Sequence, residues 1–518
     1  MRKYIAAFLA ALMLAGCGST SVQEVHNDET AVQETEAASA AVSRPEKVQS
    51  PEITYVSRFD TVTEIALSDD GITVNAGQET AAVFTTNDII YYEDLETYAS
   101  GNPYGEGEQW QRHTAEEAAA HTVVNITQPG AYRVTGHLSA GQIRVDLGAD
   151  SYYNEDAVVE LILQDADITC TVAPAVLFLN TYECDAGWST ETATAAVDTT
   201  AAGANLILEG SNTVTGSHVA KIFKDKDGEK KLWKQDGAIY SYMSMNVYGP
   251  GILELTADNE GMDTELHLTI NGGNISIYSG NDGINTNEDG VSVTTINGGE
   301  LTILAGLDKE GDGIDSNGYL VINGGTVVAA AHPAADAGLD SDLGSYINGG
   351  TVIAMGSTMD WAESDSEQVT MNLQFAGQQE AGSKILITTE DGTEVFAFDT
   401  DGQYARPFSG LILSSPGFAQ GATYHVYING VQMAYTDTDV RRGPGGMGRP
   451  GGMPMPSGEM PEGMEPPEGF DPSQWQNGEM PEDFDPGKFF GSPGETGETQ
   501  TGFYMNDKVN AFSGVTAA

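Results

Sequence analysis

The triplet Asn-Gly-Gly recurs in the middle of the chain, at Asn271-Gly272-Gly273, Asn297-Gly298-Gly299, Asn323-Gly324-Gly325 and Asn348-Gly349-Gly350. The intervals are 26, 26 and 25 residues, and a fixed period of this size indicates a stacked repeat. Each triplet precedes a short alternating apolar run, such as Ile275-Ser276-Ile277. A turn followed by a short strand in every unit of about 25 residues predicts an all-β chain, in which each unit forms one coil of a parallel β-helix.

A second corner in each repeat has the pattern Gly-apolar-acidic, with asparagine as the last residue in one coil. Because stacked coils place equivalent residues above one another, the last positions are predicted to form one ladder: Asp263, Asn285, Asp315 and Asp340. A neighbouring ladder is predicted three residues earlier, with its last member one place out of step: Glu260, Asp282, Asp312 and Asp336.

Stacked carboxylates favour a hard cation. Unit charges about 4.8 Å apart repel by roughly 0.9 kcal/mol in bulk water, and a cation turns that repulsion into attraction. Carboxylate and amide oxygens are the usual ligands of calcium. The candidate metal ligands are therefore Asp263, Asp282, Asn285, Asp312, Asp315 and Asp340. The alternative is that these residues only fill turns, where Asp and Asn hydrogen-bond the local backbone.

The overall charge limits the possible partners. The chain has 22 basic and 76 acidic residues, a formal charge of −54. Nucleic acid is excluded as a partner because phosphate binding needs a basic surface. The acidity fits an exported protein that binds cations, or one that is kept soluble by its charge.

The N-terminus predicts export. Arg2 and Lys3 precede an apolar stretch that ends in Leu14-Ala15-Gly16-Cys17, which resembles the lipobox of bacterial lipoproteins. The resemblance implies that residues 1–17 are a signal segment and that Cys17 carries a lipid anchor in the membrane. Residues 18–51 read as a flexible tether, so the protein is expected on the outer face of the bacterial cell membrane. Export also permits a disulfide between Cys170 and Cys184, the alternative being two free cysteines.

The remaining segments flank the repeats. Residues 52–122 are predicted to cover one end of the stack, with a helical turn capped by Thr114 and Glu117. The β-helix is expected over 123–357 and a small β unit over 358–440. Residues 441–518 are rich in Gly, Pro, Met and Glu and are predicted to be a disordered tail, in which Tyr504 to Val515 is apolar enough to dock back.

Four motifs in this order resemble the clostridial right-handed β-helix carbohydrate-binding family, from about Val123 to Ser357: Gly130-Ala131-Tyr132-Arg133-Val134-Thr135-Gly136, Asp236-Gly237-Ala238-Ile239-Tyr240-Ser241, the Asn-Gly-Gly series and Gly311-Asp312-Gly313-Ile314-Asp315. The resemblance implies a right-handed helix on an exported protein that binds plant-cell-wall polysaccharides, including cellulose and acidic pectic sugars. It also implies calcium contacts at Asp312 and Asp315. Asn285 and the displaced Asp336 depart from the pattern.

Aromatic side chains outside the apolar alternation suggest how a sugar would be held. Tyrosine offers an apolar face and a polar edge, which suits sugar rings. The candidates are Tyr240, Tyr278 and Tyr319. The alternative is that they pack the corners of the coils.

A non-catalytic polysaccharide binder is the expected function. A calcium-dependent lyase would need a basic side chain beside the metal, and between Gly261 and Ser357 the basic residues are Lys309 and the histidines His267 and His332. Three alternatives stay open: a polysaccharide lyase of β-helix type, a glycosidase with paired carboxylates, and a surface adhesin or scaffold for a protein partner.

Overall fold

The computed structural model describes residues 53, 55–92, 111–226, 229–308, 310–357, 360–400, 406–436 and 499–518, all within the compact unit Ser43–Ala518. Cys17 and the predicted tether lie outside these ranges, as does Lys309. The described chain is all-β, as predicted, with helix in it limited to α2 (Ala115–Ala119) and a 3-10 turn at Ala149–Tyr153. None of the helices in these ranges has the length and apolar character needed to cross a membrane.

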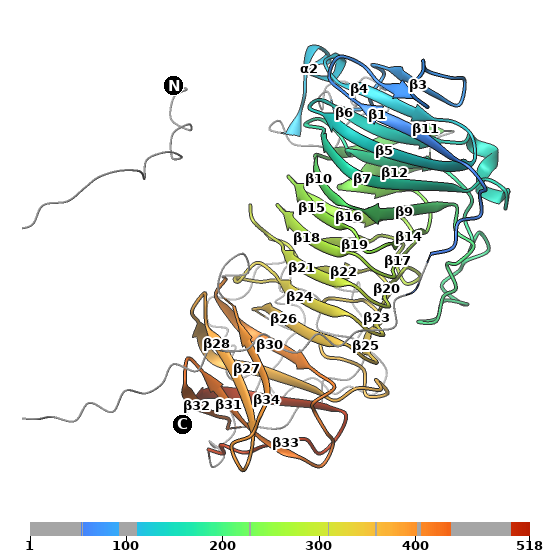
Figure 1. The fold of residues 1–518 in the computed structure, drawn as a ribbon. Helices are drawn as coiled ribbons and strands as arrows, with labels where there is room; N and C mark the ends of the chain where they lie inside the picture. Colours follow the sequence, from blue (N-terminus) through green and yellow to red (C-terminus); the bar gives the residue numbers. More distant parts are fainter. Residues whose placement is uncertain are drawn as a thin grey trace, which may run out of the picture. The chain divides into compact units, whose positions relative to one another are not determined.

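One sheet has eight strands, and all its pairs are parallel except β3 with β4. In chain order the strands are β3 (Val83–Thr86), β4 (Thr122–Ile126), β6 (Gly141–Asp146), β8 (Val176–Asn180), β13 (Gly237–Ser241), β16 (Glu260–Thr264), β19 (Ile284–Thr286) and β22 (Ile314–Ser316). Successive repeats therefore stack directly on one another in this sheet (Figure 1).

The second sheet has 24 strands and contains two parallel ladders that meet at the long strands β5 (Gly130–Leu138) and β7 (Val159–Thr169). The first ladder continues through β9 (Ala204–Glu209), β14 (Met245–Tyr248), β17 (His267–Ile270), β20 (Val293–Ile296), β23 (Tyr319–Ile322) and β25 (Gly344–Ile347). The second continues through β10 (Ser211–Gly216), β15 (Ile252–Ala257), β18 (Asn274–Ser279), β21 (Glu300–Leu304), β24 (Thr326–Ala330) and β26 (Thr351–Gly356). Each repeat contributes one strand to each of the three ladders, as β16, β17 and β18 do. The sheet as a whole is mixed, because the terminal strands join it antiparallel.

The Asn-Gly-Gly triplets join the two ladders of the large sheet. Each asparagine side chain donates to the one in the preceding repeat, from Asn297 to Asn271 at 2.9 Å and from Asn323 to Asn297 at 2.9 Å. The third residue of the triplet takes a left-handed conformation, with φ +93° at Gly299. A Cβ there would lie 2.7 Å from the carbonyl oxygen of Gly273, so only glycine fits.

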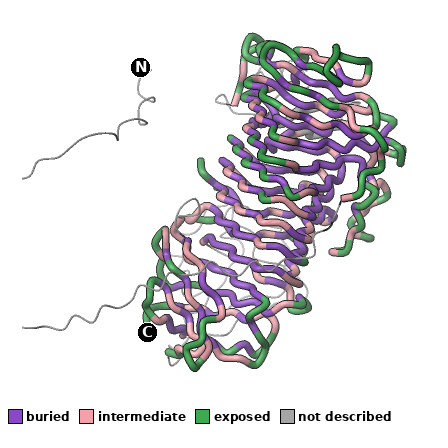
Figure 2. Tube along the Cα trace, viewed as in Figure 1, coloured by how far each residue is buried: buried purple, intermediate pink, exposed green. Residues whose placement is uncertain are grey.

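Alternate residues of the strands fill the interior. In β18, Ile275 and Ile277 are fully buried, while Asn274 between the turn and Ile275 is exposed. Buried segments run along every ladder in Figure 2. This period of two is what a strand with one buried face requires.

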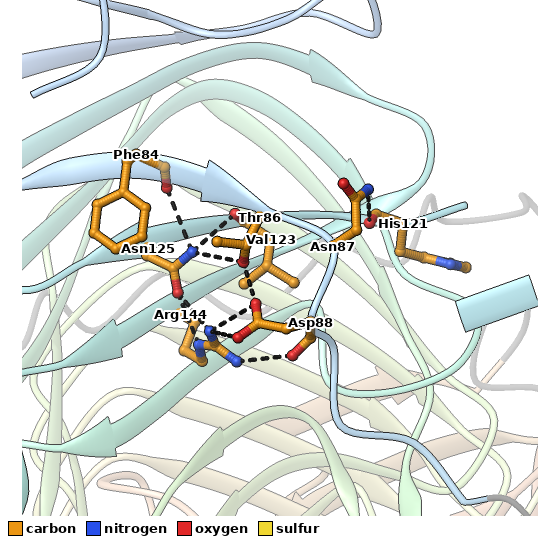
Figure 3. Close-up of polar contacts among 8 residues, drawn as sticks. All are labelled: Phe84, Thr86, Asn87, Asp88, His121, Val123, Asn125 and Arg144. Carbon is orange, nitrogen blue, oxygen red and sulfur yellow. Dashed lines mark hydrogen bonds and ion pairs between the residues drawn. The ribbon is translucent and has the colours of Figure 1, made fainter. Parts of the chain in front are cut away.

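The segment before the repeats covers the first coil. Strand β1 (Val62–Leu67) pairs in parallel with β5, and β2 (Thr73–Val74) pairs with β1. Figure 3 shows how β3 is held: the Arg144 guanidinium bonds the Asp88 carboxylate and the Asn125 side chain, and Asn125 bonds Thr86. The capping box predicted at Thr114 and Glu117 is present at the start of α2.

The segment after the repeats forms a second core against the last coil. Its strands are β27 (Thr370–Gln379), β28 (Lys384–Thr389), β29 (Glu394–Asp399), β30 (Phe408–Ser414), β31 (Thr423–Ile428), β32 (Val431–Ala434), β33 (Phe503–Tyr504) and β34 (Val509–Ala517). Strand β30 pairs antiparallel with β26 and so closes the ladder edge at that end.

The predicted disorder of 441–518 is wrong for residues 499–518, where the segment Tyr504 to Val515 docks back as its apolar character indicated. Strand β34 pairs in parallel with β27, and β33 pairs with β31. The physical reason is apolar burial, since Phe503, Phe512 and Val515 are buried against Tyr435 and its neighbours. Residues 437–498 lie outside the described ranges.

The predicted disulfide is also wrong, because Cys170 and Cys184 are both free thiols. Cys170 directly follows β7, whereas Cys184 follows β8, so an extended strand separates them. They line two different cavities.

Candidate metal centre

The predicted acidic ladder is in register. Asp263 on β16 pairs with Asn285 on β19, which pairs with Asp315 on β22. The bridge between Ile314 and Leu339 places Asp340 beside Asp315 in the next coil. The neighbouring ladder follows three residues earlier, and Asp336 is displaced by one residue, as the sequence indicated.

The neighbouring ladder has a structural role. One carboxylate oxygen of Asp282 accepts the backbone N–H of Asp312 at 2.7 Å, and Asp312 accepts the N–H of Ala337 at 2.6 Å. Asp336 accepts the N–H of Gly311 at 2.9 Å. These side chains therefore hold successive repeats together. This role differs from the predicted alternative to metal binding, because the bonds join neighbouring repeats and not the local backbone of one turn.

Asp236, Glu260 and Asp263 form a tighter cluster at strands β13 and β16. Their carboxylate oxygens lie within 4.8 Å of one another. Glu260 and Asp263 are 3% and 0% exposed. Three buried oxygens, Glu260 Oε2, Asp263 Oδ2 and Asn285 Oδ1, receive no hydrogen bond from the described residues. Buried oxygens without a donor are costly, so this cluster is short of positive charge.

One basic side chain reaches the cluster. Lys234 ends the hairpin of β11 (Val219–Lys226) and β12 (Glu229–Gln235), and its Nζ lies 3.1 Å from Asp236 Oδ2. Burial lowers the pKa of Lys234, but the Glu260 and Asp236 carboxylates outweigh it and raise the pKa above its usual value. Lys234 is therefore an ammonium ion at neutral pH and offsets one of the three carboxylates.

The carboxyl groups respond to the same environment. Burial and the adjacent Glu260 raise the pKa of Asp263 well above its usual range, and Lys234 acts in the opposite direction. Burial likewise raises the pKa of Glu260. Without a further cation, these groups reduce their mutual repulsion by binding protons.

A second acidic group lies farther along the ladder. Asp360 comes from the segment after β26, and its carboxyl group hydrogen-bonds that of Asp340. Burial, followed by Asp340, raises the pKa of Asp360 to about 7. Burial and Asp340 also raise the pKa of Asp315 well above its usual range.

The donor set fits a hard divalent cation. Calcium takes six to eight oxygen ligands at about 2.3–2.6 Å. Asp236, Glu260, Asp263 and Asn285 supply carboxylate and amide oxygens, three of which lack a donor. With Lys234 counted, three carboxylates and one ammonium leave a charge of −3 + 1 = −2, which one divalent cation balances.

The tyrosines are not brought together. Tyr240 is 0% exposed and its hydroxyl donates to Glu265, so it cannot stack on a sugar, and that prediction is wrong. Tyr278 is half-buried on β18, and Tyr319 is half-buried on β23 with its ring centroid 6.3 Å from that of Tyr346. The two lie on different ladders and do not form one binding face.

The metal ligands predicted from the sequence did not include Asp236, and neither Lys234 nor Asp360 was expected near the acidic residues. Asp236 could have been found from the sequence, because Asp236-Gly237 has the same acidic-Gly pattern as Glu260-Gly261 in the following repeat. Lys234 and Asp360 come from segments outside the repeat, and the period says nothing about where they lie.

The chain was compared with protein-family models, curated proteins and solved structures. Residues 120–394 match the family model described as "Carbohydrate-binding domain-containing protein". A polysaccharide lyase-like protein from C. thermocellum, solved as a gadolinium derivative, aligns with 56% of this chain and 93% of its own at 20% identity and a TM-score of 0.32. No curated protein matches the chain.

Proposed function

The chain belongs to the carbohydrate-binding domain-containing family, and from this we propose that it is a non-catalytic polysaccharide-binding protein stabilised by calcium. The observation that carries the proposal is the extent of the family match, which spans the stacked repeats from β4 to the small β unit. We further propose that the three ladders are the faces of a right-handed parallel β-helix. Cys17 would carry the lipid anchor on the outer face of the membrane.

Calcium is supported by the cluster of Asp236, Glu260 and Asp263. The oxygens without donors are the ligand type that calcium prefers, and they lie in a rigid sheet. Calcium bound there would join the three successive repeats that carry Asp236, Asp263 and Asn285 and would cancel the repulsion between the carboxylates. It would contribute stability at a site made of the repeats themselves.

The absence of catalysis is supported by the state of the basic side chains. Arg133 pairs with Glu64 at 2.8 Å and Arg144 with Asp88 at 3.1 Å, so both hold the first coils together. Lys234 is beside the carboxylates, but as an ammonium ion it cannot accept a proton from a sugar.

The position of Lys234 keeps one other function open. A lyase removes a proton next to a carboxylate with a base beside calcium, and calcium bound to the cluster would cancel the charge that keeps Lys234 protonated. Incubation with polygalacturonate and calcium distinguishes the two functions. We expect no unsaturated, ultraviolet-absorbing product; product that is lost in Lys234→Met would establish the lyase instead.

The binding function is tested on an array of neutral and acidic polysaccharides, with calcium and with chelator. We expect binding to at least one class of glycan. Failure to bind any glycan under either condition would leave the adhesin or scaffold function.

A further inference from the structure

The connection between β8 and β9, residues 181–203, differs from the equivalent turns of later coils. The turns between β13 and β14, β16 and β17, and β22 and β23 span only 242–244, 265–266 and 317–318. Residues 181–203 instead extend over the ladder of β14, β17 and β20. Their hydrogen bonds reach Asn246 on β14 and His267 on β17.

Both ends of this connection are fixed. The buried Glu183 carboxylate accepts the Ser244 backbone N–H at 2.6 Å and its hydroxyl at 2.9 Å. At the other end, the Thr199 hydroxyl donates to Asn246 at 2.7 Å, and the Asn246 amide donates to the Thr199 carbonyl at 2.8 Å. The connection therefore has a defined conformation before any ligand binds.

A cavity of about 240 Å³ lies between the connection and the ladder, over His267 and Val291. At about 30 Å³ per water molecule, the cavity has room for roughly eight waters. A single sugar ring fits such a space.

The walls of the cavity combine an aromatic ring with oxygens. Trp188 is half-buried, and its indole hydrogen-bonds the Tyr152 side chain, which fixes the orientation of the ring. The carboxylates of Asp185 and Asp198 and the hydroxyls of Ser189 and Thr192 also line the cavity. An aromatic face beside carboxylates and hydroxyls meets the C–H face and the hydroxyl groups of a sugar.

His267 positions one of the carboxylates. Its Nδ1 accepts the backbone N–H of Val293 at 3.1 Å, so the ring proton is on Nε2, which lies 3.3 Å from Asp185 Oδ2. His267 is 1% exposed, and burial lowers its pKa, so the ring is neutral. Asp185 is 43% exposed at the cavity, and a carboxylate can accept further hydrogen bonds at its two oxygens.

We propose that this cavity binds one sugar unit of an uncharged glycan. The proposal rests on the carbohydrate-binding function above and adds the place and the charge of the ligand. Asp185 and Asp198 repel uronic and sulfated sugars, and their oxygens accept the hydroxyl protons of a neutral one.

The test measures binding of neutral oligosaccharides and their parent polysaccharide, with a panel of neutral monosaccharides as competitors. We expect competition by at least one monosaccharide and quenching or enhancement of tryptophan fluorescence on binding. Trp188→Ala should weaken monosaccharide binding at least tenfold, and Trp188→Phe should recover part of it. Asp185→Asn should weaken it several-fold, whereas Trp361→Ala, outside the cavity, is the matched control.

The outcomes separate this proposal from the function on which it rests. If polysaccharide binds but no monosaccharide competes and Trp188→Ala binds normally, the cavity is not the site and the binding function stands. If uronic acids compete better than neutral sugars, the assignment of an uncharged ligand is refuted. If no glycan binds the wild-type protein, the proposed function and this inference both fail.

Discussion

Asp263→Asn should raise stability without calcium and should reduce the stability that calcium adds. The carboxylate oxygens of Asp236, Glu260 and Asp263 lie within 4.8 Å of one another. At an effective dielectric constant near 20, one such pair of charges repels by about 3.5 kcal/mol. Ionised Asp263 faces two carboxylates, and the Lys234 ammonium offsets about one of these repulsions, so at a pH where Asp263 is ionised, removing its charge should stabilise the protein by about 3.5 kcal/mol without calcium.

With calcium the same substitution removes a charged ligand. A cation present at one hundred times its dissociation constant stabilises the folded state by about 2.7 kcal/mol, and much of that gain should be lost in Asp263→Asn. Wild-type stability without calcium should also fall as pH rises from about 4, because the pKa of Asp263 is raised in the folded state and deprotonation is then unfavourable. The variant should lack that part of the pH dependence.

The assay is thermal unfolding at pH 8 in chelator and in millimolar calcium. At about 2 °C per kcal/mol, the variant should melt about 7 °C higher than wild type in chelator and gain less from calcium. Asp156→Asn, at an exposed position, is the matched control. An unchanged or lower melting temperature in chelator, or an equal calcium gain in both proteins, would refute the reasoning.

Three further changes test other parts of the structure. Gly299→Ala should cost at least about 2 kcal/mol, since it forces a side chain into a left-handed conformation against the preceding turn, whereas Gly377→Ala, with open space around it, should be nearly neutral in urea unfolding. Asp360→Asn should flatten the loss of stability that wild type shows in chelator as pH rises from about 4 to 7, because burial raises the pKa of Asp360 to about 7; an unchanged pH profile would contradict this. Asn297→Ala breaks two bonds of the amide ladder and should lower stability by about 1–3 kcal/mol, against little change for the exposed Asn274→Ala.

The sequence predicted the register of the strands more accurately than it predicted the sugar-binding residues. Tyr240 was expected to face a sugar because tyrosine suits that role, yet it is fully buried with its hydroxyl on Glu265. A tyrosine ring can lie in a core or stack on a ligand, and only the tertiary packing around the ring determines which of the two it does. The cavity under residues 181–203 went unpredicted, because its walls come from a long connection and from strands some 80 residues away in sequence.

The sequence by itself determined the all-β class, the stacking of the repeats and the alignment of Asp263, Asn285 and Asp315. A fixed period does this because parallel strands of equal spacing pair in one register, so the position in the repeat sets the position in the ladder. Only the tertiary structure decided that Lys234 and Asp360 join the acidic groups and that the docked C-terminal segment lies beside β27. These segments lie outside the period, and their places depend on long-range packing and charge, which no local pattern encodes.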